Sequence, residues 1–177
     1  MSPIKFRDAV EADLPSIVTI YNATIPGREV TADLEPVSVE SRLAWFRAHN
    51  SERRPLWVVE RVGQNREAML GWLSFSDFYG RPAYGATVEI SIYLAENARR
   101  TGLGTTMLER AIDHAPSLSI KTLLGFIFGH NAASLRLFET HGFTRWGTLP
   151  RVASLDGVER DLVIVGLRLD ALRMNRG

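Results

Sequence analysis

The stretch Arg99–Thr105 places two arginines, two glycines and two threonines within seven residues. It follows an alternating apolar run at 88–94 and precedes apolar residues with helical spacing. A basic, glycine-containing turn at the start of a helix offers free backbone N–H groups and the positive end of the helix dipole to an anion. The stretch therefore predicts a phosphate-binding turn. A plain tight connection between a strand and a helix is the alternative.

Composition limits the class of protein. The chain has 177 residues, 45% of them hydrophobic, so we expect one compact domain over residues 1–177. A net charge of +1 from 21 basic and 20 acidic residues argues against a nucleic-acid partner. With no cysteine, an acyl transfer cannot pass through a cysteinyl intermediate, and direct transfer is the natural alternative. No signal-peptide core and no long apolar run is present, which predicts a cytoplasmic protein without a membrane partner.

Periodicity predicts the elements that position the turn. Helices are expected from Leu14 to about Asn22, after a Ser38 cap to about Asn50, from the turn to His114, and before the C-cap-like Gly142. Strands are expected at 4–7, 56–62, 69–78, 88–94, 120–128, 144–152 and 159–169, with turns at 63–65 and at Asp156–Gly157. The residues from Arg28 to Val37 are expected to form a long functional loop.

The turn and its surroundings carry a family resemblance. Arg99-x-x-Gly102-x-Gly104, followed by a strand, Asn131-x-x-Ser134, a helix and Gly142-Phe143, resembles the GNAT superfamily of acyl-CoA N-acetyltransferases. The segments 78–84 and 87–89 and the pair Tyr21-Asn22 look like the phosphinothricin and methionine sulfoximine N-acetyltransferase group. The resemblance extends from Ile4 to about Leu169.

This resemblance implies a fold, a cosubstrate and an assembly. The fold would be α/β (α+β), with a mixed, mostly antiparallel central sheet of about seven strands and about four flanking helices. A V-shaped splay would separate the fourth and fifth strands. The cosubstrate would be acetyl-CoA, with no metal, and the protein would be a homodimer.

The resemblance also assigns cofactor contacts. Amides in the turn would hold the pyrophosphate of coenzyme A, while the fourth strand would pair with the pantetheine arm and the Leu94 amide would polarise the thioester carbonyl. Asn131 would contact pantetheine, cap the helix carrying Ser134, or do both. The expected cofactor-binding residues are Ile92, Tyr93, Leu94, Arg99, Arg100, Thr101, Gly102, Leu103, Gly104, Thr105, Asn131 and Ser134.

Glu89 is the candidate general base. An alkyl amine is protonated near pH 7 and must lose a proton before it attacks, and burial in an apolar strand would raise the pKa of the Glu89 carboxyl toward a useful range. A surface glutamate on the outward face is the alternative. One departure stands out, because Phe138 occupies a helix position at which relatives of this kind often carry tyrosine or histidine.

Candidate substrate residues lie in loops. Arg81 could bind the carboxylate of an amino acid, Tyr79 and Tyr84 could wall the pocket, and Arg28 is a lesser anion-binding candidate, although a lone arginine can equally be a solvated surface charge. The leading hypothesis is acetyl transfer from acetyl-CoA to the amino group of a small amino acid or analogue in a ternary complex. The alternatives are another amine, such as a peptide N-terminus, a polyamine or an aminoglycoside, and a non-catalytic acyl-CoA-binding sensor.

Overall fold

A single seven-stranded sheet organises the chain, in the strand order β1-β2-β3-β4-β5-β7-β6. The computed structural model describes residues 3–63 and 68–170. The strands are β1 (Ile4–Asp8), β2 (Leu56–Arg61), β3 (Ala68–Asp77), β4 (Thr87–Leu94), β5 (Thr122–Phe128), β6 (Thr144–Leu155) and β7 (Val158–Arg168). The α-helices are α1 (Leu14–Asn22), α2 (Val39–Arg47), α3 (Leu103–His114) and α4 (Ala132–Thr140).

The expected mixed, mostly antiparallel sheet is confirmed, because β4 and β5 form the parallel pair and the other neighbouring strands are antiparallel. The order of helices and strands also agrees with the prediction. Of the turn predicted at 63–65, residues 64 and 65 lie outside the described residues. In the part of the chain that the structure describes, no helix is long and apolar enough to cross a bilayer.

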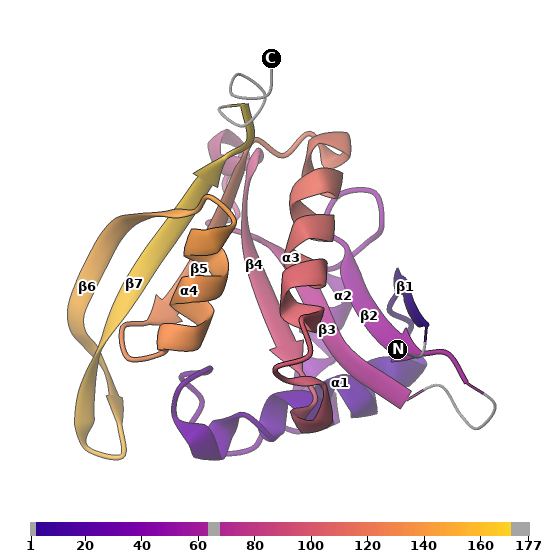
Figure 1. The fold of residues 1–177 in the computed structure, drawn as a ribbon, viewed down its shortest axis with the longest axis horizontal. Helices are drawn as coiled ribbons and strands as arrows, with labels where there is room; N and C mark the ends of the chain where they lie inside the picture. The colour runs from indigo at the N-terminus through magenta and orange to yellow at the C-terminus, as the bar shows by residue number, and fades with distance from the viewer. Residues whose placement is uncertain (1–2, 64–67, 171–177) are drawn as a thin grey trace.

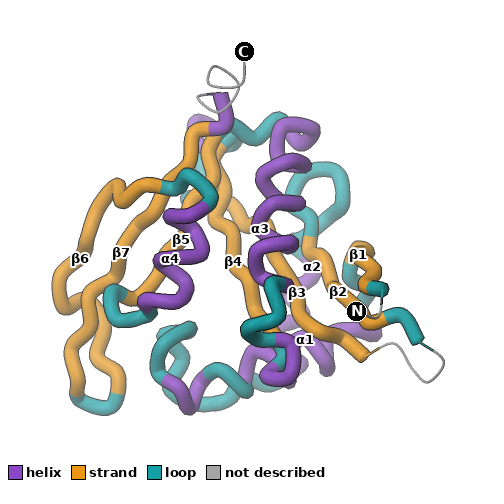
Figure 2. The backbone as a smooth tube through the Cα atoms, viewed as in Figure 1, coloured by secondary structure: helices purple, strands orange, loops and turns teal. Residues whose placement is uncertain are grey.

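Helices cover the sheet on two faces, with α3 and α4 on one and α1 and α2 on the other (Figures 1 and 2). Side chains of a strand alternate between faces, and β3 follows this rule. Leu73 and Phe75 belong to the core cluster that includes α3 and α4, whereas Trp72 packs with α1 in a second cluster. The two faces of the sheet therefore have separate apolar cores.

The parallel pairing of β4 with β5 is short. It covers the three pairs from Thr87↔Thr122 to Glu89↔Leu124, although β4 continues to Leu94 and β5 to Phe128. Figure 1 shows the two strands diverging toward their C-terminal ends. This arrangement supports the expected splay. Among the described residues, the backbone of β4 beyond Glu89 has no strand partner on that side.

Candidate functional site

The predicted phosphate turn lies directly before α3. Gly102 is the N-cap and has a φ of 85°, a left-handed conformation that glycine adopts without steric cost. Arg100 also has a positive φ, of 61°. The Thr106 N–H donates to the Gly102 carbonyl at 3.1 Å, so the amides of residues 103–105 precede the first bond within the helix. These amides have no intrahelical acceptor and are available to an anion.

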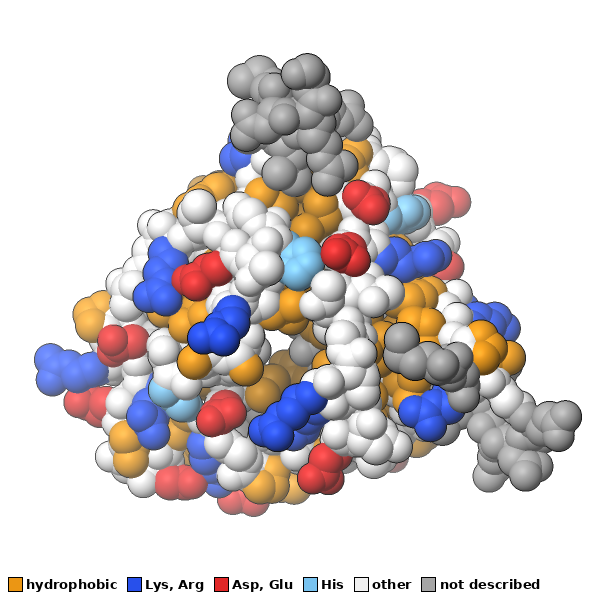
Figure 3. Space-filling view, viewed as in Figure 1, with side chains coloured by type: hydrophobic (Ala, Val, Ile, Leu, Met, Phe, Trp, Pro, Cys, Tyr) orange, Lys and Arg blue, Asp and Glu red, His pale blue; other side chains and the backbone are white. Residues whose placement is uncertain are grey.

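A groove connects this turn with the space between β4 and β5. A cavity of about 350 Å³ is lined by Arg99 and Arg100, the end of β4, the start of α4 and part of the loop after α1. A second cavity of about 140 Å³ lies between β4, β5 and α4. We call the two together the interstrand groove, because they share Glu29, Val30, Ile92, Tyr93, Leu94, Asn131, Ser134 and Leu137. Figure 3 shows a hollow on this face with Lys or Arg side chains at its rim.

The backbone of β4 faces this groove. The Ala95 N–H donates to the Leu70 carbonyl at 2.9 Å, which fixes the alternation of the antiparallel ladder with β3. Alternate residues of a ladder direct their N–H and C=O groups to opposite sides. The backbone groups of Ile92 and Leu94 therefore point away from β3, toward the side where pairing with β5 has ended. Strand-like hydrogen bonding to an extended ligand is possible there.

Asn131 is built into the start of α4. It is 6% exposed, and its Oδ1 accepts a hydrogen bond from the Ser134 N–H at 3.0 Å, which confirms the N-cap role. Its Nδ2 donates to the Glu29 carbonyl at 3.0 Å. The neighbouring His130 is bonded through Nε2 to the Arg28 carbonyl at 2.8 Å. Both contacts hold the loop after α1 against the wall of the groove.

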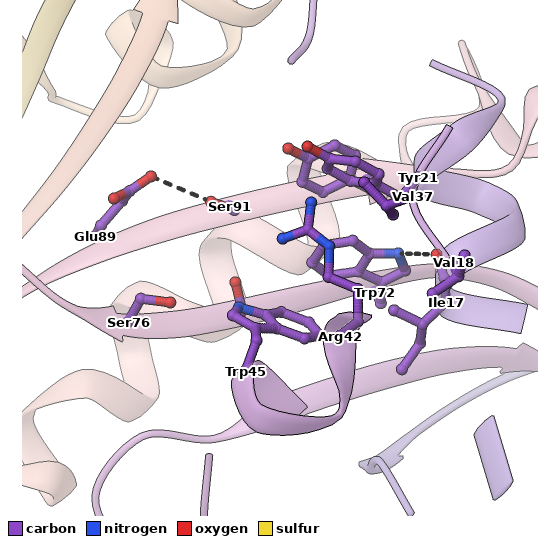
Figure 4. Close-up of a pocket in the computed structure, with 12 residues that line it drawn as sticks. Ile17, Val18, Tyr21, Val37, Arg42, Trp45, Trp72, Ser76, Glu89 and Ser91 are labelled. Carbon is purple, nitrogen blue, oxygen red and sulfur yellow. Dashed lines mark hydrogen bonds between the residues drawn. The ribbon is translucent and has the colours of Figure 1, made fainter. Parts of the chain in front are cut away.

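A separate cavity, of about 220 Å³, lies on the opposite face of β4 from the interstrand groove, beneath α1 and α2. We call it the α1–α2 cavity (Figure 4). Its strand residues are Trp72, Ser74 and Ser76 of β3 and Glu89, Ser91 and Tyr93 of β4. The other lining residues are Ile17, Val18, Tyr21, Val37, Arg42 and Trp45. Ser91 and Tyr93 line the interstrand groove as well, so β4 separates the two spaces.

Glu89 occupies the junction of these spaces. It is the last β4 residue paired with β5, and its half-buried side chain lines the α1–α2 cavity. Burial raises the pKa of the Glu89 carboxyl, and the hydroxyl of Ser91, which donates to Oε1 at 3.4 Å, partly opposes that rise. A carboxyl with a raised pKa next to a cavity is suited to accept a proton near neutral pH.

The wall of the α1–α2 cavity away from Glu89 is aromatic and carries one guanidinium group (Figure 4). The rings of Trp72 and Tyr93 are stacked, with centroids 4.3 Å apart. Arg42 lies over the Tyr21 ring at 4.7 Å, and its Nη2 donates to the Asp33 carboxylate at 2.8 Å. Sequence reasoning missed Arg42. The available signal was its i, i+3 spacing from Trp45, which puts both on one face of α2.

The predicted substrate residues lie elsewhere in this chain. Tyr79, Arg81 and Tyr84 are exposed and line neither the α1–α2 cavity nor the interstrand groove. Both tyrosines pack on the Phe78 ring. Arg28 is turned toward the β6–β7 hairpin, where its Nε lies 2.7 Å from the Asp156 carboxylate. The structure does not bring these four side chains together with Glu89, and their assignment to the substrate stays a prediction.

Phe138 lines the interstrand groove while packing edge-on against Phe143. It has no proton to donate. Nearby His141 is bonded through Nδ1 to the Leu137 carbonyl at 2.7 Å, as expected for a residue at a helix end. Among the described residues, no group of three or more histidine, aspartate or glutamate side chains could hold a metal ion.

Known proteins resemble this chain over nearly its full length. The model of the acetyltransferase (GNAT) domain matches residues 4–144. A Bacillus subtilis (strain 168) protein named "Putative phosphinothricin acetyltransferase YwnH" is 50% identical over 92% of this chain and 98% of its own. The L-methionine sulfoximine/L-methionine sulfone acetyltransferase of Pseudomonas paraeruginosa (strain DSM 24068 / PA7) is 32% identical over 94% and 95%.

A solved structure agrees with this likeness. The GNAT superfamily phosphinothricin acetyltransferase of Sinorhizobium meliloti, in complex with AcCoA, superposes with a TM-score of 0.85 at 28% identity, covering 95% of this chain and 89% of that one. The chain therefore belongs to the GNAT acetyltransferase family. Within that family it is an acetyl-CoA-dependent N-acetyltransferase of the phosphinothricin and methionine sulfoximine group.

Proposed function

We propose that the protein transfers the acetyl group of acetyl-CoA directly to the amino group of a small amino acid or analogue of the phosphinothricin or methionine sulfoximine type. The observation that carries this proposal is the position of Glu89 at the junction of two spaces. Ser91 and Tyr93 line both the α1–α2 cavity and the interstrand groove, so an amine in the cavity can meet a thioester in the groove. Holding both reactants at this junction would supply much of the catalysis.

Each part of the site has a distinct task in this proposal. The amides of residues 103–105, with Arg99 and Arg100, bind the pyrophosphate, and the backbone of β4 near Ile92 pairs with the pantetheine arm. Glu89 accepts a proton from the substrate ammonium, directly or through water. The neutral amine then forms the C–N bond, and the C–S bond breaks to release a thiolate that needs no acid at Phe138. The second proton that the nitrogen loses is taken up by this thiolate, so the products are the amide and the free thiol of coenzyme A. The Leu94 amide stabilises the oxyanion that forms in between.

The proposed acceptor class is supported by the size of the α1–α2 cavity and by the relatives. About 220 Å³ suits a small amino acid better than an aminoglycoside or a long polyamine. Relatives at 32% and 30% identity carry the names L-methionine sulfoximine/L-methionine sulfone acetyltransferase and L-amino acid N-acyltransferase. The test is thiol release from acetyl-CoA across phosphinothricin, methionine sulfoximine, methionine sulfone, polyamines and peptides. No turnover of any small amino acid would refute the proposal.

We also propose that the protein is a homodimer that uses the β6–β7 hairpin. Several large apolar side chains are exposed on it, including Trp146 at 50%, Leu149 at 44% and Val152 at 52%. Apolar side chains grouped on an exposed strand are typical of an interface. Light scattering should give twice the 19.8 kDa mass of the chain. The Trp146→Ser variant should dissociate at low micromolar concentration, and a monomeric wild type would contradict the proposal.

A further inference from the structure

We propose that Arg42 binds the α-carboxylate of the acceptor, so that the site selects amino acids with a free carboxylate over amines that lack one. This inference rests on the proposed function and adds the group that orients the substrate. Of the twelve residues that line the α1–α2 cavity, Arg42 is the one with a basic side chain and Glu89 the one with a carboxyl group. A zwitterionic amino acid has one group for each of them.

The positions of these two residues fit that division of charge. Arg42 comes from α2 and Glu89 from β4, and in Figure 4 they lie on either side of Ser91. Glu89 is next to the end of the β4–β5 pairing, where the thioester would lie. A carboxylate held by Arg42 would therefore direct the amine of the same molecule toward Glu89. An amine without a carboxylate would lack this second point of attachment.

Contacts with neighbouring residues hold the Arg42 guanidinium in place. Its plane lies over the Tyr21 ring, and Nη2 donates to Asp33, which also accepts a hydrogen bond from the Tyr21 hydroxyl. Within residues 3–63 and 68–170, the Nε and Nη1 of Arg42 have no hydrogen-bond partner. The anchored guanidinium thus keeps donors for one incoming carboxylate, in the planar geometry that such a group binds.

Arg81 is the competing candidate for this role. It is exposed in the loop before β4 and does not line the α1–α2 cavity of its own chain. Arg42, by contrast, has a side chain only 28% exposed and lines the same cavity as Glu89. The two assignments make opposite predictions for single substitutions, so one experiment can separate them.

The experiment pairs two substrates with a set of variants. Methionine sulfone and 3-(methylsulfonyl)propan-1-amine share the amine and the sulfone, and only the first has a carboxylate. The variants are Arg42→Gln, Arg42→Lys and Arg81→Gln. The matched control is Arg47→Gln, which removes an exposed arginine of the same helix that pairs with Glu11 at 3.3 Å.

We expect Arg42→Gln to raise KM for methionine sulfone by about 10- to 100-fold, the usual effect of losing a charged hydrogen-bonded partner, with kcat changed by less than about threefold. KM for the amine should change by less than about twofold. Arg42→Lys should lie between, because an ammonium keeps the charge without the planar pair of donors. Arg47→Gln should match the wild type, and circular dichroism with thermal unfolding confirms that each variant is folded.

Equal losses on both substrates, or no loss on methionine sulfone, would overturn the assignment. A loss confined to Arg81→Gln would overturn it in favour of the loop. Calorimetric titration of methionine sulfone in the presence of coenzyme A gives a readout that does not depend on turnover. If the wild type binds the amino acid without acetylating it, the proposed function fails, and the carboxylate assignment is still judged by comparing Kd for Arg42→Gln. If the wild type does not bind it, both proposals fail.

Discussion

Replacing Glu89 by glutamine removes the proposed base while keeping the size of the side chain. General base catalysis typically contributes 10²- to 10⁴-fold, so we expect kcat to fall by about 10²- to 10³-fold, the lower part of that range if water relays the proton. Burial raises the pKa of this carboxyl above its ordinary 4.5. Wild-type activity should therefore decline as the pH falls through the raised pKa, because the protonated acid accepts no proton. The variant should lack this decline.

The stability of Glu89→Gln should rise relative to the wild type, although its kcat falls. A carboxyl whose pKa is higher in the folded than in the unfolded state contributes stability that is present below the unfolded pKa and lost as the pH rises through the folded pKa. Ionised Glu89 therefore destabilises the fold at pH 8, and Glu89→Gln should remove that penalty. Urea unfolding should show the variant at least as stable as the wild type at pH 8, with the difference shrinking toward pH 4. Lower activity with equal or higher stability cannot be attributed to misfolding.

Two control variants sharpen this test. Glu52→Gln changes an exposed glutamate in a turn and should leave kcat and its pH profile unchanged. Ser91→Ala removes the hydroxyl that lowers the pKa of Glu89, so the acidic decline should move to higher pH while kcat near pH 9 is retained. The measurements are initial rates of thiol release from acetyl-CoA between pH 5 and 9. If kcat of Glu89→Gln stays within about threefold of the wild type from pH 6 to 9, the base assignment is refuted.

Further predictions concern the supports of the site. Arg54→Met should lower the free energy of unfolding in urea by about 2 kcal/mol, because this 2% exposed arginine donates to the Asp77 carboxylate at 2.6 Å and to the Gly85 carbonyl at 2.8 Å, whereas Asp77 keeps its ion pair with Arg53. Gly102→Ala should cost about 1 kcal/mol and weaken coenzyme A binding in calorimetry, since its φ of 85° strains any L side chain. Gly104→Ala should be milder on both measures, because the added methyl would meet side-chain atoms no closer than 3.4 Å. Asn131→Ala should cost about 1 kcal/mol in thermal unfolding through loss of the cap and should raise KM for acetyl-CoA.

Local patterns predicted the elements well because each one depends on residues close together in the chain. The alternation at 88–94 and the Ser38 cap, whose hydroxyl oxygen accepts from the Ser41 N–H at 3.2 Å, are such cases. Two elements differ in length: α2, predicted to about Asn50, ends at Arg47, and β6, predicted to end at 152, extends to Leu155. The register of β6 shifts between Leu149 and Ala153, and such an irregularity breaks the alternation that marks a strand.

The α1–α2 cavity could not be predicted in this way, because its walls come from two helices, two strands and the loop residue Val37, which meet only in three dimensions. On sequence alone, Arg42 looks like any solvated arginine on a helix. The surroundings of Arg28, a candidate for binding an anionic substrate group, could not be predicted from the sequence either. Its carboxylate partner, Asp156, lies 128 residues further along the chain, and no local pattern indicates that contact.

The two-residue period of β4 explains how one strand can serve both reactants. Side chains at Glu89, Ser91 and Tyr93 face the α1–α2 cavity, whereas Val88 and Ile90 belong to the core on the α3 side. The backbone groups of Ile92 and Leu94 face the interstrand groove, where side-chain identity has little influence on hydrogen bonding. In the proposed function, acceptor choice would thus depend on side chains of α1, α2 and one face of β4, and pairing with the cofactor would depend on the main chain. Substitutions at the α1 and α2 residues that line the α1–α2 cavity should accordingly change the acceptor range while leaving the affinity for acetyl-CoA nearly constant.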